Sequence, residues 1–468
     1  MASPAASMST LSTFANWAAN YKTWPELKAW LQTSEPGIDI IESEDSAYAI
    51  LRNSKEKEGE AAIAEDAVSE TAQLCRSIVW DTEANLPCCV APFAARRDQK
   101  IPSDSALRLE DFVEGVMINV FRARGDAETH VTTRSKLDAD GTFYSERSFR
   151  ELFEEAMDAK RTSLDEIENL IGAPSDSVAA TFITMVLAHP EHRVVRTVEQ
   201  ANLWAIYRGT VANDGTVTFY TEDLPVAWRP KTYSLTFKGE FAELKTKFDE
   251  IKTSKPWFWQ GLVVHSGLQR WRFRNAEHDR VRKDLRGTES NSFGRFLRLR
   301  AQKRVQEYLR IYQEDNSDFQ GFERDYRALT KTLYSWYCKV HKEHSVAFKG
   351  LPKSVQPLVF DLHKFYLSNL RPQNKTLHMV EVIDWIVTYL KSPYGVPNMI
   401  RFSKETEQPP PSSVGLNTQR HVALDGDSDN LRVTVSIEGD NSTADGPRAV
   451  APVSPIVAVG NLALGEVV

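Results

Sequence analysis

Residues 181–222, TFITMVLAHPEHRVVRTVEQANLWAIYRGTVANDGTVTFYTE, contain three apolar and β-branched runs with no long helix between them. These runs are TFITMVLA (181–188), LWAIYRG (203–209) and TVTFYTE (216–222). Short runs of this kind, separated by turn residues, predict β-strands. Successive strands without intervening helices favour an antiparallel sheet over a doubly wound parallel one.

The same texture extends in both directions along the chain. Further strand-like runs are SIVW (77–80), GVMINVFRA (115–123), HVTTRS (130–135), GLVVHS (261–266) and RWRFR (270–274). Two segments are instead helical in pattern, SFRELFEEAMDAKR (148–161) and EFAELKTKFDEIKTS (240–254). We therefore expect an antiparallel-rich α+β domain.

The flanking segments have a different composition. Residues 11–32 read as an amphipathic helix broken by Pro25. After residue 276 the apolar spacing becomes helical: one long helix carries Phe293 to Tyr312 on its apolar face, and the next carries Phe319 to Trp336. The last segment is rich in Pro, Ser, Gly and Asp and is expected to be disordered. The predicted domains are an N-terminal helical extension (1–69), a mixed domain (70–275), a helical C-terminal domain (276–402) and a disordered tail (403–468).

Composition narrows the class of protein. Of 468 residues, 41% are apolar and 26% are charged, as in ordinary globular proteins. No apolar run reaches the roughly 18 residues of a membrane helix, so we expect no membrane association. The first residues, MASPAASMSTLSTF, lack the features of a secretory signal. The four cysteines show no metal-binding spacing and predict reduced thiols, in cytoplasm or nucleus.

Charge is distributed unevenly. The net charge is -7, yet residues 270–310 hold 13 Lys or Arg against five Asp or Glu, an excess of eight positive charges. A basic face on an acidic protein can bind a phosphate backbone, so we expect this segment to bind RNA. It could equally be a solvated helix face. The expected RNA-binding residues are Arg295, Arg298, Lys303, Arg304 and Arg310.

Seven short elements occur in a characteristic order. They are LCRSIVWD (74–81), APFAARRD (91–98), DFVEGVMINVF (111–121), VTTRSKLDADGTFYS (131–145), TFITMVLAHPEHRVV (181–195), WQGLVVHSG (259–267) and RWRFRN (270–275). This order resembles the T-even phage-type RNA ligases, relatives of DNA ligases and mRNA capping enzymes. The resemblance covers about 200 residues and implies a nucleotidyltransferase (ATP-grasp-like ligase) domain. It also implies ATP and Mg²⁺ as cofactors, and nucleotide and RNA as partners.

The resemblance places the family's functional residues unevenly. Phe112 stands where the nucleophilic lysine is expected, and Gln260 where a catalytic glutamate is expected. A second glutamate has no counterpart near Thr184 or Met185. The remaining implied site residues are Arg76, Glu114, Gly115, Arg134, Ser135, Lys136, Gly261, Arg272 and Arg274.

These departures bear on activity. Covalent nucleotidyl transfer needs an amine aimed at phosphorus, and a phenylalanine ring has no lone pair to attack with. Gln260 could coordinate through its carbonyl oxygen but brings no charge. Arginine at 272 and 274 instead keeps the phosphate-binding charge and adds a bidentate fork. The pattern predicts a descendant that binds phosphate without forming an enzyme-adenylate.

Simpler interpretations remain for each feature. The segment RWRFR also fits an edge strand with one wet face. Phe112 could be a core residue read one step out of register, with Lys100 or Lys136 as the nucleophile. His189, His192 and His265 are interpreted as structural or surface histidines. The aromatic stripe of the C-terminal helices is interpreted as core.

Three classes of function follow. The first is a catalytically silent ligase-like domain that binds nucleotide or RNA ends. The second is an active ATP-dependent RNA ligase in RNA repair, using a displaced lysine or pre-adenylated ends. The third is a protein-interaction scaffold. The oligomeric state is not predicted from the sequence.

Overall fold

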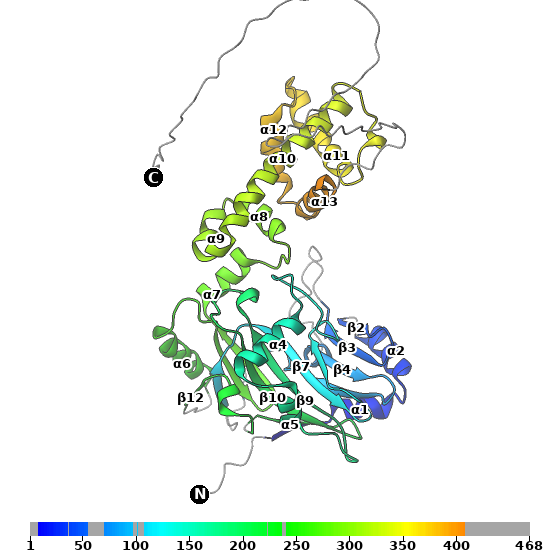
Figure 1. Cartoon of the computed structure of the whole chain (residues 1–468), viewed down its shortest axis with the longest axis vertical. Coiled ribbons are helices and arrows are strands. Elements are labelled where there is room, and N and C mark those ends of the chain that lie inside the picture. The colour runs from blue at the N-terminus through cyan, green and yellow to red at the C-terminus, as the bar shows by residue number, and fades with distance from the viewer. Residues whose placement is uncertain are drawn as a thin grey trace, which may run out of the picture. The chain divides into compact units, whose positions relative to one another are not determined.

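The computed structural model describes residues 8–35, 37–54, 70–96, 101, 107–221, 223–235 and 240–407. Strands and helices are mixed up to residue 275, and helices alone follow (Figure 1). Every strand pair within the sheets of the described residues is antiparallel. The expected α+β class, with antiparallel sheets and a helical C-terminal region, is confirmed.

Three sheets form the mixed part of the described chain. The first has the order β1 (Met8–Leu11), β11 (Val217–Tyr220), β10 (Asn202–Ala212), β9 (Val178–Ala188), β7 (Val116–Ala123) and β8 (His130–Thr133). The second is β12 (Thr232–Tyr233), β6 (Leu107–Asp111), β13 (Gly261–Ser266) and β14 (Gln269–Arg274). The third is β2 (Ile38–Glu42), β3 (Tyr48–Asn53), β4 (Ile78–Asp81) and β5 (Leu86–Val90). Each of the eight strand-like runs in the sequence overlaps one of these strands.

The six-stranded sheet is buried on both faces, which explains why β9 reads as a continuous apolar run. On one face Ile183 and Met185 contact α4 (Phe149–Lys160) and α5 (Leu164–Ile171). On the other, Phe182 belongs to the core shared with the third sheet, α1 (Thr13–Asn20) and α2 (Trp24–Ser34). Alternating side chains of one strand therefore serve two cores.

Both predicted helices of the mixed domain are present. α4 begins at a capping box in which Ser148 and Glu151 exchange hydrogen bonds, and it ends at Arg161 in the left-handed conformation. α6 (Phe241–Thr253) packs on the second sheet, where Leu244 and Phe248 meet the apolar side chains of β13 and β14.

The N-terminal segment is not a separate helical extension. It has two helices, α1 and α2, with Pro25 in the first turn of α2. It also contributes β1 to the first sheet, and β2 and β3 to the third. Because β3 pairs with β4, a boundary after residue 69 would divide a sheet. The sequence underestimated this segment because its strands are short.

The helical region contains two corrections. The predicted long helix is two helices, α8 (Ser292–Ala301) and α9 (Val305–Ile311), because Lys303 adopts a left-handed backbone conformation with φ 59°. This turn lets Tyr308 stack on Phe319, with ring centroids 5.1 Å apart. The predicted tail begins within α13 (Gly395–Glu407), and the rest of it lies outside the described residues.

Other helices build one further core from buried aromatic and aliphatic side chains, as the sequence indicated. Helices of this core not yet named include the π-helices η4 (Val281–Arg286) and η7 (Tyr366–Leu370), α10 (Asn316–His341), α11 (Gln356–Phe365) and α12 (Met379–Tyr389). The short helices α3 (Glu70–Leu74) and α7 (Ala276–Arg280) contribute no residue to it. None of the described helices is long and apolar enough to cross a membrane. All four cysteines are free thiols.

Candidate anion-binding cleft

A cavity of about 830 Å³ is lined by the first and second sheets. Met117 and Val186 line it from the first sheet, and Val263, His265 and Arg270 from the second. Its volume lies within the range of small-molecule sites, roughly 300–1,000 Å³. We refer to this cavity as the cleft.

Strand β14 places its arginines on one face. Trp271 and Phe273 belong to the core beneath α6. Because successive side chains of a strand alternate, Arg270, Arg272 and Arg274 share the opposite face. Arg270 lines the cleft directly. The edge-strand interpretation correctly predicted that one face of this strand is apolar core. The other face carries a row of guanidinium groups.

Phe112 lines the cleft where the resemblance would place a lysine. Its backbone N–H donates to the carbonyl of Gly261, with an N–O distance of 2.9 Å. The guanidinium carbons of Arg272 and Arg274 lie 5.9 and 5.0 Å from its ring centroid. These are cation–π distances, so the ring takes up part of the space beneath both charges.

Three further positive side chains line the same cleft: Arg76, Arg134 and Lys136. Burial, followed by the charges of Arg134, Arg272 and Arg274, lowers the pKa of Arg76 to about 10. Burial, followed by the charge of Arg272, also lowers the pKa of Arg274 to about 10. Both shifts mean that burial, and after it the neighbouring guanidinium charges, destabilises the charged forms. Arg272 and Arg274 are not among the lining residues: they lie over the ring of Phe112, which lines the cleft, and Arg274 also pairs with Asp279 at 3.5 Å.

Two glycines allow the backbone to close around Phe112. Gly115 has φ 157°, and a Cβ there would lie 2.1 Å from the carbonyl oxygen of Leu187. Gly261 has φ 136°, and a Cβ would lie 1.9 Å from the carbonyl oxygen of Phe273. Side chains do not fit at either position, which explains the glycines on physical grounds.

Glu114 does not line the cleft, although the resemblance counted it as a site residue. One carboxylate oxygen accepts from the backbone N–H groups of Val195 and Arg196, at 2.9 and 3.0 Å. The other contacts Nε2 of His278 in α7 at 2.5 Å. Glu114 therefore joins the loop after β9 to the first helix of the C-terminal region, and its role here is structural.

The last two sequence-derived site residues differ in position. Ser135 lines the cleft and accepts a hydrogen bond from Arg52, with a 2.5 Å N–O distance. Gln260 is not among the lining residues. Its backbone carbonyl accepts from the N–H of Asn275, and its buried side-chain oxygen has no hydrogen-bond partner. Gln260 is thus next to Gly261 without facing the cleft.

The carboxylates of the cleft are already engaged. Glu110 contacts Nε2 of His265 at 2.8 Å and Nε of Arg108 at 3.3 Å. Asp111 accepts from the Tyr233 hydroxyl and from Nε1 of Trp259, at 2.7 and 2.9 Å. Across the described residues, no group of three or more His, Cys, Asp or Glu side chains could hold a metal ion. The donor set does not fit a Mg²⁺ held by the protein alone.

One wall of the cleft is aromatic. Phe143 and Phe149 line it together with His192, whose ring centroid lies 5.3 Å from that of Phe149. Burial, and then the charge of Arg286, lowers the pKa of His192 to about 4. The imidazole is therefore neutral at pH 7, and this wall is an uncharged surface of planar rings.

Of the five expected RNA-binding residues, Arg295 is buried and Arg298 and Arg304 are held in ion pairs, which corrects the expectation that all five face outward as free charges. Arg295 is only 2% exposed and bonds the carbonyl of Glu289. Arg298 bonds Glu289 at 2.5 Å and the carbonyls of Asp284 and Leu285. Arg304 bonds Glu307 at 2.8 Å. Only Lys303 and Arg310 of this set are exposed.

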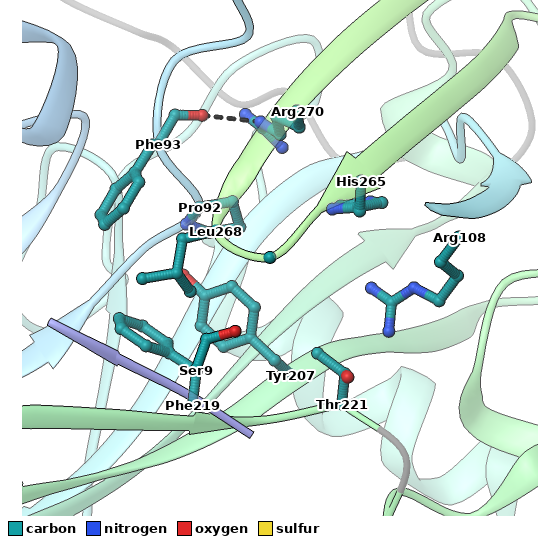
Figure 2. A pocket seen from close by; sticks show the side chains of 11 residues that line it. Ser9, Pro92, Phe93, Arg108, Tyr207, Phe219, Thr221, His265, Leu268 and Arg270 are labelled. Carbon is teal, nitrogen blue, oxygen red and sulfur yellow. Dashed lines mark hydrogen bonds between the residues drawn. The ribbon is translucent and has the colours of Figure 1, made fainter. Parts of the chain in front are cut away.

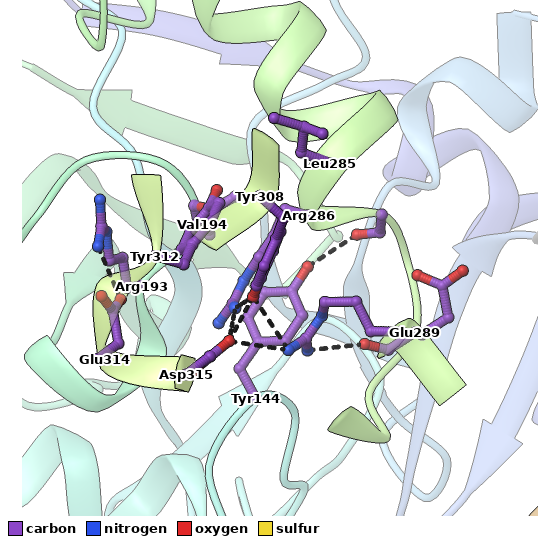
Figure 3. Close-up of polar contacts among 12 residues, drawn as sticks. Tyr144, Arg193, Val194, Leu285, Arg286, Glu289, Tyr308, Tyr312, Glu314 and Asp315 are labelled. Atoms are coloured by element: carbon purple, nitrogen blue, oxygen red, sulfur yellow. Dashed lines mark hydrogen bonds and ion pairs between the residues drawn. The ribbon is translucent and has the colours of Figure 1, made fainter. Parts of the chain in front are cut away.

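The reason for this correction is a polar core within the helical region. The guanidinium of Arg286 donates to the Tyr308 hydroxyl, which bonds Asp315 in turn (Figure 3). Arg286 also lies over the Tyr144 ring, 4.1 Å from its centroid. Arg295 belongs to the same core, 3.6 Å from Asp315 and 5.1 Å from the Tyr144 ring centroid. Helical periodicity cannot show that acidic and aromatic partners meet Arg286 and Arg295 from distant segments.

Sequence reasoning also missed residues of the cleft. Glu110, His265 and Arg270 line it, yet they belong to none of the implied motif positions. The alternation RWRFR was a usable signal for Arg270, since it shares a strand face with the two arginines already named. Of the two positions considered for the missing glutamate, Thr184 lines the cleft and Met185 is core. Lys100 lies outside the described residues.

Two comparisons with known proteins found no relative of this chain. A scan of protein-family models and a search of curated proteins each found no match to the chain.

Proposed function

We propose that the cleft binds the phosphates of a nucleotide or of an RNA end, without forming a covalent nucleotidyl intermediate. The single observation that carries the proposal is the arginine cluster around Phe112. Arg76 is buried beside Arg134, Arg272 and Arg274, and burial, followed by these neighbouring charges, lowers the pKa of Arg76 to about 10. Such a cluster of positive charges destabilises the unliganded protein. A bound anion would neutralise these charges, so the cluster favours anion binding.

The rest of the cleft suits a nucleotide. Its volume of about 830 Å³ exceeds what a lone phosphate would need. The neutral aromatic wall of Phe143, Phe149 and His192 offers a stacking surface for a base, while the arginines offer bidentate contacts to phosphate oxygens. An RNA end combines the same two groups, a base and a phosphate. Such a ligand fits the proposed nucleotidyltransferase-type fold.

Chemistry at the cleft is restricted. Phe112 cannot act as a nucleophile, since a phenyl ring offers no lone pair to phosphorus. Lys136 is the lysine among the described lining residues, and it is exposed. It is the candidate for the alternative function, an RNA ligase with a displaced lysine. Because the donor set does not fit a protein-held Mg²⁺, no step is assigned to a metal.

Intact mass spectrometry after incubation with ATP and Mg²⁺ separates the two functions. We expect no added mass, because no amine replaces Phe112. A gain of one adenylate on Lys136, identified by peptide mapping, would establish the ligase alternative instead.

Thermal unfolding with ATP, GTP or a 5′-phosphorylated oligoribonucleotide tests binding itself. The double variant Arg272→Ala, Arg274→Ala should lose the ligand-induced rise in melting temperature. The matched control is Arg324→Ala with Arg371→Ala, which removes two arginines from exposed positions. An unchanged rise in the cleft variant would place the ligand elsewhere, and no rise in the wild type with any of these ligands would favour a scaffold.

A further inference from the structure

A second, smaller cavity of about 60 Å³ lies next to the cleft. Pro92, His265 and Arg270 line both spaces, so the two are neighbours. Figure 2 places Arg108, His265 and Arg270 along one side of this cavity, and Tyr207, Phe219 and Thr221 along the other. Its lining residues come from six strands, β1, β6, β10, β11, β13 and β14, and from three connecting segments, and none of them is one of the motif positions named above.

Every charged group that lines the small cavity within the described residues is cationic. Arg108 and Arg270 bring two guanidinium groups, and no carboxylate is among the lining residues. Glu110, which does not line the cavity, contacts Nε of Arg108 at 3.3 Å and Nε2 of His265 at 2.8 Å. That carboxylate offsets one charge from outside the cavity, which leaves an excess of positive charge facing inward.

Arg270 is the residue that most needs a ligand. Its side chain is only 8% exposed, and its Nε donates to the carbonyl of Phe93 at 2.6 Å (Figure 2). Its Nη2, however, is buried without a hydrogen-bond partner. A buried donor on a charged group that lacks a partner is costly, so an acceptor in the cavity would be bound favourably.

The size of the cavity selects a small acceptor. A water molecule requires roughly 10–15 Å³ by this measure, so the space holds about four waters or one tetrahedral oxyanion. The hydroxyl of Ser9, at the edge strand β1, adds a further donor to the lining. We propose that this cavity binds a single phosphate group, as a second oxyanion site beside the cleft.

The phosphate could be free or could belong to a ligand that extends from the cleft. Both sources present the same tetrahedral oxyanion to Arg108 and Arg270. The proposal goes beyond the proposed function, because Ser9 and Arg108 line the small cavity and not the cleft, although Arg270 lines both. A bound phosphate would join β1, β6 and β14, three strands from two sheets.

The experiment measures thermal unfolding of the full chain in inorganic phosphate, at constant ionic strength, on an Arg76→Met background that weakens the cleft. We expect the phosphate-dependent rise in melting temperature to persist in this protein. Adding Ser9→Leu, which fills the cavity, or Arg270→Met should weaken the apparent phosphate affinity about tenfold or more. Thr10→Leu is the control, because it places the same leucine side chain at the neighbouring exposed position of β1.

The outcomes separate this inference from the proposed function. A phosphate effect that survives both Ser9→Leu and Arg270→Met overturns the inference. So does a phosphate effect that Arg76→Met removes completely, and the cleft alone would then bind the anion. If Ser9→Leu removes the phosphate-dependent rise in melting temperature, the inference is supported. This holds even if Arg76→Met leaves ATP binding unchanged, because that second result would count only against the proposed function of the cleft.

Adding saturating ATP to the wild-type protein identifies the source of the phosphate. If ATP removes the additional effect of inorganic phosphate, the ligand of the cleft supplies the group. If the two effects add, the cavity takes free phosphate. Either result supports an oxyanion site. Should Arg270→Met fail to fold, because it loses the bond to Phe93, Arg108→Met replaces it in the same comparison.

Discussion

Replacing Arg76 by methionine should stabilise the unliganded protein while weakening anion binding. Methionine has similar length, and the hydrogen bond at this position, from Nε of Arg134 to the carbonyl of Arg76, uses only the backbone. The substitution therefore removes a charge with little change in packing. Most variants of a folded protein lose stability, so a gain would be a specific signature of a strained functional site.

The magnitude follows from the pKa. The folded environment lowers the pKa of Arg76 to about 10, with burial first and then three arginines as the cause. Since each tenfold change in proton affinity is worth about 1.36 kcal/mol, the charged form costs about 3 kcal/mol relative to the unfolded chain. The side chain borders a cleft that water can enter, so we expect about 1–2 kcal/mol to be recovered.

The sign of the pH dependence is also fixed. A folded-state pKa below the ordinary arginine value means that the unfolded chain binds the proton more tightly. The cost is therefore fully present at neutral pH and is relieved only as pH rises through about 10. The stability difference between wild type and Arg76→Met should be constant from pH 6 to 8 and should shrink above pH 9.

The assay is thermal unfolding in a buffer without phosphate or sulfate, with and without ATP. We expect a melting temperature about 2 °C higher for Arg76→Met than for the wild type, given the modest shift per kcal/mol of a large domain. Saturating ATP at 100 times Kd should stabilise the wild type by about 2.7 kcal/mol and the variant far less. Arg324→Met, at an exposed position of α10, is the matched control and should change stability by less than about 0.5 kcal/mol. A variant that melts below the wild type and keeps its full ATP response would refute the reasoning.

Three further predictions concern other parts of the structure. Gly261→Ala should lower the free energy of unfolding by about 3 kcal/mol or more in a denaturant titration, because its Cβ would lie 1.9 Å from a backbone oxygen at φ 136°; a loss below 1 kcal/mol would show that the strand adjusts. The pKa of His192 is lowered to about 4, so its contribution to stability should be complete above about pH 6.5 and lost as pH falls toward 4, and His192→Gln should flatten that part of a stability–pH curve. Arg298→Glu should destabilise the helical region by about 3 kcal/mol, since it sets a carboxylate against Glu289 and two carbonyls, whereas Arg310→Glu should cost less than about 0.5 kcal/mol; equal effects on melting temperature would argue against the internal role of Arg298.

Local sequence pattern determined much of the fold. A strand or helix of this chain is stabilised by contacts that recur every two or every 3.6 residues, and such periods are visible in runs like TFITMVLA and SFRELFEEAMDAKR. The short strands β1, β2 and β3 escaped detection, because four to six residues with partly exposed faces carry little periodic signal. Their pairing with strands later in the chain is a property of the sheet and not of the segment.

For the site, the sequence determined which residue types were available, and the tertiary structure decided which of them face one another. The two-residue spacing of Arg272 and Arg274 places them on one face of any strand that contains both. That Arg76 and Arg134 approach the same space from other segments depends on how two sheets pack, which a linear pattern does not encode. The basic segment shows the opposite case, because Arg295 meets Asp315 and Arg298 meets Glu289 only once the chain folds, whereas Arg304 pairs with Glu307 on the next turn. A count of charged residues along a segment gives its net charge. Only those charges that remain unpaired after folding are available at the protein surface.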